Sequence, residues 1–135
     1  MVSLFLSFIA GLFTIILMDS IWLGIVVKWV IIREFGSLIE LLPNGSIKFS
    51  IPVGLAAWAI IVIWVMIFAS TKATSYQTAL LNWALFWWVS YAIYDLTNLT
   101  FIKWYSSFFT AIDIAWGIVL CAGVSVVCYS VWKLF

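Results

Sequence analysis

The sequence contains no histidine and little charge: six basic and five acidic side chains make up 8% of the 135 residues. Without histidine, the chain holds neither a Ser-His-Asp triad nor a histidine cluster for zinc. Soluble domains are about 25% charged, so this chain has too few charges to be one. A net charge of +1 without a basic cluster argues against nucleic acid as a partner.

The residues that are present are mainly apolar: 67% are hydrophobic and 19% are aromatic, including ten tryptophans. Disordered chains are poor in both classes, so disorder is excluded. This composition is typical of an integral membrane protein. The length allows a single domain, residues 1–135, and leaves no room for a separate soluble catalytic module.

The two cysteines, Cys121 and Cys128, lie seven residues apart in one apolar segment. At a helical rise of 1.5 Å per residue their Cα atoms are about 10 Å apart, which is too far for a disulfide. We therefore interpret them as small residues on one packing face of a helix.

Four apolar segments are each long enough to cross a membrane as a helix, which takes about 20 residues for about 30 Å of hydrocarbon. They cover residues 4–27, 51–70, 78–98 and 107–131. The sequence therefore predicts an all-α integral membrane protein, with four transmembrane helices in an up-down bundle.

The connection between the first two segments has an amphipathic pattern. Apolar residues recur there at helical spacing, with charged and polar residues between them, up to a Pro-Asn-Gly sequence. This pattern predicts a short helix lying in the membrane interface. The apolar positions are Ile31, Phe35, Leu38, Ile39 and Leu42.

Two polar sequences predict where the later helices begin. Residues 74–77, Thr-Ser-Tyr-Gln, match a capping box at the start of the third span. Ser106 and Ser107 are suitable caps for the fourth span.

An even number of spans puts both termini on the same side of the membrane. The loops at the other side carry more basic residues, and basic residues favour the cytoplasmic side. The sequence therefore predicts a multi-pass membrane protein whose termini both lie outside. The basic residues of those loops are Lys28, Arg33, Lys48 and Lys103, against Lys72 and Lys133 elsewhere.

Three of the five acidic residues, Asp19, Asp95 and Asp113, fall inside the predicted spans. An ionised aspartate near the bilayer centre costs about 2.5–3.5 kcal/mol, so each needs a partner, water or a proton. A rise of 1.5 Å per residue places all three within about 5 Å of depth of one another. We therefore predict one shared intramembrane polar site, opening toward the side of the membrane that carries the first and third loops.

Aromatic residues accompany these acids at helical spacing. The sequence Asp-x-x-Trp occurs twice, and glycines that permit close helix approach, Gly24 and Gly117, follow each time. We expect the second span, which has no charged residue, to lie at the periphery of the site. The predicted site residues are Asp19, Asp95, Asp113, Tyr91, Tyr94, Asn98, Trp22 and Trp116.

Buried aspartates also have a purely structural interpretation, because they accept hydrogen bonds that hold helices in register. For three acids at one depth we favour a functional site. Tryptophans in the middle of the spans suggest an aromatic box for a cation, although packing or lipid contact explains most of them more simply. These tryptophans are Trp22, Trp58, Trp64, Trp83, Trp87, Trp88 and Trp116.

Three stretches resemble a known family: residues 18–24 (Met-Asp-Ser-Ile-Trp-Leu-Gly), 94–99 (Tyr-Asp-Leu-Thr-Asn-Leu) and 113–117 (Asp-Ile-Ala-Trp-Gly). Their order and spacing resemble the signature of small predicted membrane proteins catalogued as domain of unknown function 2177. The chain departs from the family pattern between Lys28 and Trp58. The resemblance implies four helices and a shared polar motif, but no established activity. Members tend to be encoded near lipid-modifying enzymes, which implies a link to membrane lipids.

Three functions remain open. The first is a proton- or cation-handling transporter or channel, working as a homo-oligomer because four helices leave little room for an internal pathway. The second is lipid binding or lipid modification, with membrane lipids as partners. The third is a structural or accessory subunit. No motif identifies a cofactor or nucleophile, so an enzyme is less favoured; a cation bound by the aspartates would be magnesium or calcium, which prefer oxygen ligands.

Overall fold

The structure, a computed structural model, describes residues 2–70 and 72–135. The described part is all-α, as the composition predicts, and its only β pairing is an isolated bridge between Leu41 and Ile47. In chain order the elements are α1 (Val2–Ile21), the π-helical turn η1 (Trp22–Val26), α2 (Lys28–Phe35), the 3₁₀ turn η2 (Gly36–Leu38), α3 (Ile51–Val65), the π-helical turn η3 (Met66–Ser70), α4 (Tyr76–Phe101) and α5 (Ser107–Leu134).

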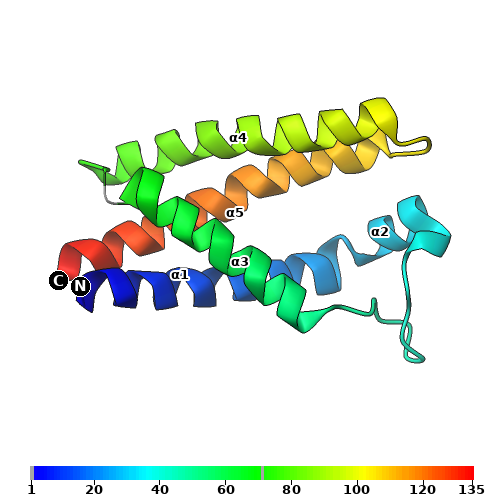
Figure 1. Cartoon of the computed structure of the whole chain (residues 1–135), viewed down its shortest axis with the longest axis horizontal. Coiled ribbons are helices and arrows are strands. Elements are labelled where there is room, and N and C mark those ends of the chain that lie inside the picture. The colour runs from blue at the N-terminus through cyan, green and yellow to red at the C-terminus, as the bar shows by residue number, and fades with distance from the viewer. Residues whose placement is uncertain (1, 71) are drawn as a thin grey trace.

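Helix α5 organises the bundle, because it packs along both α1 and α4 (Figure 1). Helix α3 crosses the bundle and contacts α1 and α5. Every long helix contributes to one core, whose members include Ile15, Val62, Trp83 and Val124. The core therefore joins segments that are far apart in the sequence.

Gly11 allows the close approach of α1 to its neighbours. A Cβ atom at this position would lie 2.6 Å from Sγ of Cys128 and 2.9 Å from Cγ1 of Val62. Both cysteines of α5, Cys121 and Cys128, are buried in this packed interior. Their location agrees with the predicted role as small packing residues.

Within the described residues, three helical stretches are long and apolar enough to cross a membrane: Val2–Val26, Ile51–Phe68 and Ser107–Leu134. They correspond to the predicted first, second and fourth spans. Helix α4 has 26 residues and runs beside α5 (Figure 1). Its mean hydropathy is lower because Trp, Tyr, Asn and Thr replace aliphatic residues. A fourth crossing by α4 stays a prediction.

The connection between α1 and α3 is less helical than the amphipathic pattern suggests. Helix α2 ends at Phe35, and Gly36 follows with φ +50°, a conformation that favours glycine. A turn through Gly45 (φ +74°) then brings Lys48 back to Glu40, with an Nζ–Oε1 distance of 2.7 Å. The predicted continuation of the helix through Leu42 was wrong, because glycine and this turn end it.

Side-chain caps begin the last two helices. Ser75 forms the capping box of α4 with Thr78, one residue later than the predicted box of residues 74–77. The Ser106 hydroxyl accepts a hydrogen bond from the backbone N–H of Phe109 at 3.1 Å, which confirms the predicted cap of α5. Caps of this kind satisfy N–H groups that have no partner within the helix.

Helix α1 begins and α5 ends at the same end of the bundle (Figure 1). We therefore expect cysteines introduced at Ser3 and Phe135 to react with a membrane-impermeant maleimide from the same side, and one at Lys103 from the opposite side. The parent chain is the control, since its own cysteines are fully buried. Labelling of positions 3 and 135 from opposite sides would contradict an even number of crossings.

Candidate functional site

Asp19 lies in the last turn of α1 and joins three helices. It is 9% exposed and accepts two indole N–H groups. Trp116 of α5 donates to Oδ1 at 2.9 Å, and Trp58 of α3 donates to Oδ2 at 2.7 Å. The expectation that the second span lies at the periphery was therefore wrong, because α3 supplies one of the two donors.

The two Asp-x-x-Trp sequences form one arrangement across helices. Trp22 and Trp116 stack with ring centroids 4.4 Å apart and planes 5° from parallel. Trp116 donates to the aspartate of the other sequence, Asp19. The stack therefore holds the Trp116 indole in place as a donor from α5 to α1.

Asp95 of α4 is fully buried. The hydroxyl of Tyr105, in the turn between α4 and α5, donates to Oδ1 of Asp95 at 2.8 Å. Oδ2 is buried and meets no N–H or O–H donor among the described residues. The side chains of Asp95 and Asp113 lie close enough to each other for a hydrogen bond. Two carboxyl groups can share such a bond only when one of them carries a proton.

Tyr91 lies near all three acids. Its hydroxyl is close enough to Asp19, Asp95 and Asp113 to interact electrostatically with all of them. Its ring lies against Gly117, where a Cβ atom would come within 2.7 Å of the ring. Gly117 thus has the predicted role of allowing close approach. Gly24 does not, since a Cβ atom there would meet nothing within 4 Å.

The other predicted donors differ in their placement. Tyr94 is 64% exposed, on the outer side of α4 and away from the acids. Asn98 is half-buried and lies close enough to interact with Tyr105, the residue that donates to Asp95. The structure thus brings together Asp19, Asp95, Asp113, Tyr91, Trp22, Trp116 and, indirectly, Asn98.

Two residues of the site were missed by sequence reasoning. Tyr105 was not among the predicted site residues, and Trp58 was only one of seven tryptophans suggested for an aromatic box. Tyr105 reaches Asp95 because the chain turns between α4 and α5, and Trp58 reaches Asp19 because α3 crosses α1. Helical spacing carries no signal for either contact, since both join different elements.

A pocket of about 350 Å³ lies beside Asp19 at the end of the bundle formed by residues 28–50. Its walls are mainly apolar and come from the end of α1, η1, α2, the loop before α3, and α3 itself. The lining residues are Asp19, Ser20, Leu23, Gly24, Lys28, Ile31, Ser46, Ile47, Phe49 and Trp58.

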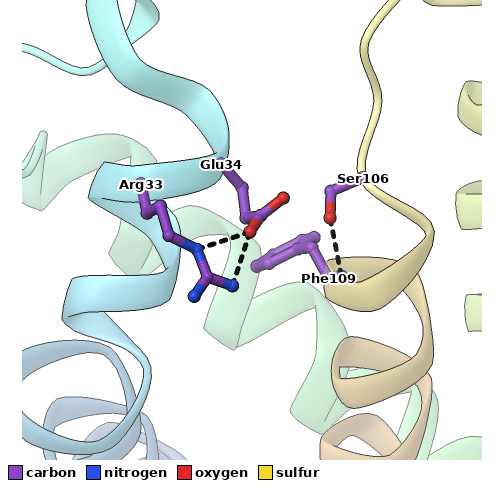
Figure 2. A network of polar contacts seen from close by, with 4 residues as sticks. All are labelled: Arg33, Glu34, Ser106 and Phe109. Atoms are coloured by element: carbon purple, nitrogen blue, oxygen red, sulfur yellow. Dashed lines mark hydrogen bonds and ion pairs between the residues drawn. The ribbon is translucent and has the colours of Figure 1, made fainter.

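Helix α2 packs on the start of α5. Figure 2 shows Arg33 paired with Glu34, at 2.6 Å between Nη2 and Oε1, opposite the Ser106 cap. Hydrogen bonding to Ser106, together with Arg33, holds the pKa of Glu34 below its usual range. Phe35 of α2 contacts the Tyr105 ring edge-on, with centroids 5.8 Å apart. Helix α2 is thereby in contact with the residue that donates to Asp95.

The described residues contain no group of three or more His, Cys, Asp or Glu side chains placed to hold one metal ion together. Their ion pairs are Arg33–Glu34 and Lys48–Glu40, both outside the acid cluster. The chemistry that the site offers is therefore that of carboxyl groups, indole and phenol donors, and any proton that they share.

The comparison with known families supports a membrane protein. The family described as "Predicted membrane protein (DUF2177)" matches residues 4–130. The chain belongs to the DUF2177 family. The match covers every long helix and all the acids of the site, so the DUF2177 protein is a membrane protein with several candidate spans. No curated protein and no solved structure matches this DUF2177 chain.

Proposed function

We propose that this membrane protein handles protons, with Asp95 and Asp113 as the pair that holds and releases them. The closeness of the two carboxyl groups supports this proposal most directly, because a hydrogen bond between them forms only with a proton that both groups can hold. Two carboxylates at one buried site titrate as a pair and exchange protons through their shared bond.

Asp19 provides the connection between this pair and the pocket. It lines the pocket and interacts electrostatically with Asp113. Its two indole donors hold the carboxylate in place and leave further lone pairs for water or a proton. A proton arriving at the end of the bundle formed by residues 28–50 reaches Asp19 first, then the pair.

Within the described part of one chain, no path leads protons from the acids of the site to the end of the bundle where the termini lie. The next layers of the bundle are apolar and tightly packed, with Ile15, Leu120, Cys121 and Val124 fully or almost fully buried. Complete transport therefore needs a second copy of the chain or a rearrangement of the helices. We propose a homo-oligomer, with α4 as the fourth membrane crossing and the termini on the outer side.

Proton flux into proteoliposomes tests the proposal. We expect the parent protein to acidify vesicles that contain a pH-sensitive dye when a potassium diffusion potential, negative inside, drives protons inward. Asp95→Asn and Asp113→Asn should each lower this flux at least tenfold, because an amide cannot pass on a proton. Glu40→Gln is the matched control, since Glu40 is exposed and pairs only with Lys48 on the surface.

Flux equal to that of protein-free vesicles would contradict proton transport and favour the structural or accessory function. Unchanged flux in both aspartate variants would show that protons pass elsewhere. Replacing the external protons by sodium or potassium gradients tests a cation as the transported species. A flux that depends on the sodium or potassium gradient and not on pH would show that this cation, and not the proton, is the transported species.

A further inference from the structure

The pocket beside Asp19 has two charges of opposite sign, and neither has an ionic partner among the described residues. Asp19, at the α1 end of the pocket, accepts only neutral indole donors. Lys28, in the first turn of α2, lies over the Trp29 ring at 5.1 Å and pairs with no carboxylate of the described chain. The pocket is thus complementary to a ligand that carries a cation and an anion.

The volume of the pocket limits the size of that ligand. Asp19 and Lys28 both line this one space of about 350 Å³. The flexible four-carbon stem of Lys28 allows its ammonium group to reach a ligand bound there. A compact zwitterionic group fits between these charges, whereas a large soluble molecule does not fit into about 350 Å³.

The surroundings of the pocket select a lipid. Its walls are mainly apolar, through Leu23, Ile31 and Ile47 among others. Large apolar side chains close in sequence to lining residues, such as Ile25 (72% exposed) and Ile51 (64% exposed), are exposed on the surface. A ligand with its head in the pocket can therefore place its acyl chains along these helices, where they cover exposed apolar surface.

Asp19 determines which cationic head is preferred. Each carboxylate oxygen already accepts one indole N–H and has a second lone-pair direction free. A primary ammonium has N–H donors for these directions and forms charge-assisted hydrogen bonds. A quaternary ammonium has none, and a glycerol head lacks the positive charge.

We propose that this pocket binds the headgroup of a phosphatidylethanolamine-type membrane lipid, with its ammonium on Asp19 and its phosphate on Lys28. The Trp58 side chain, which donates to Asp19 and stacks with Phe49 at 5.5 Å between centroids, forms the wall beside the ammonium. The site goes beyond proton handling and does not depend on it.

Native mass spectrometry of the full chain released from mixed micelles tests this site. The protein is offered equal amounts of short-chain phosphatidylethanolamine, phosphatidylcholine and phosphatidylglycerol. We expect one bound phosphatidylethanolamine at about tenfold higher occupancy than either competitor, a ratio that corresponds to about 1.4 kcal/mol. Equal occupancy of the three lipids would overturn the proposal.

The variants separate this pocket from unspecific lipid contact. Gly24→Leu should abolish the preference by filling the pocket, and it has room to fold, since a Cβ atom at Gly24 meets nothing within 4 Å. Asp19→Asn and Lys28→Gln should each lower the preference, whereas Lys48→Gln, outside the pocket, should keep it. Unchanged selectivity in Gly24→Leu would overturn the proposal. Asp113→Asn separates the two proposals, because it should stop proton flux and leave lipid selectivity intact.

Discussion

Asp95→Leu will lower the free energy of unfolding by about 2–6 kcal/mol, because two partly buried polar groups lose their contact with Asp95 at about 1–3 kcal/mol each. One is the Tyr105 hydroxyl, which donates to Asp95 at 2.8 Å, and the other is the carboxyl group of Asp113. Asp95→Asn should cost much less. Its amide oxygen still accepts from Tyr105, and its N–H₂ group replaces the shared proton toward Asp113.

Thermal unfolding in detergent, followed by circular dichroism, measures this difference. Asn82→Leu is the matched control, because Asn82 lies exposed on the same helix, α4. We expect this control to unfold at or above the temperature of the parent chain. Equal stability of Asp95→Asn and Asp95→Leu would contradict a buried hydrogen-bonded pair and, with it, the basis of the proposed proton handling.

The second large effect concerns the two indoles on Asp19. We expect Trp58→Phe and Trp116→Phe each to cost about 1–3 kcal/mol, the usual penalty for removing a hydrogen bond to a charged group. Phenylalanine removes the N–H donor but keeps an aromatic ring, next to Trp22 at position 116 and next to Phe49 at position 58. The double variant should cost more than the sum of the single variants. With both donors gone, the nearly buried Asp19 carboxylate keeps no hydrogen bond of those described.

A double-mutant cycle of unfolding free energies checks this coupling. Trp88→Phe is the control, since Trp88 is 53% exposed on α4 and its substitution removes only surface contact. Strictly additive costs would mean that Trp58 and Trp116 act on separate groups. Costs equal to that of Trp88→Phe would mean that neither indole N–H stabilises Asp19.

Composition and hydrophobic run length were enough to predict the membrane class, the all-α fold and the approximate bounds of the long helices. These properties depend only on each segment and its solvent, because a long apolar run in lipid must satisfy its backbone hydrogen bonds internally. Local chemistry also placed the Ser106 cap. It placed the α4 cap one residue too early and extended α2 too far, because glycine conformations and a turn decide where that helix stops.

The same energetic argument indicated the acid cluster. A buried carboxyl group is costly in lipid wherever the chain puts it, so Asp19, Asp95 and Asp113 were recognisable from the sequence. Their partners were not. Trp58 and Tyr105 reach the acids from other elements, and Tyr94, which shares helical spacing with Asp95, faces outward.

The sequence by itself thus determined that this protein lies in a membrane, where its long helices are, and which residues need polar partners there. Only the tertiary structure decided that α3 crosses α1 at Trp58, that Trp116 donates a hydrogen bond to Asp19, and that Asp95 lies close to Asp113. The physical reason is that helical spacing describes neighbours on one helix, whereas these contacts depend on how the apolar faces of different helices pack against each other.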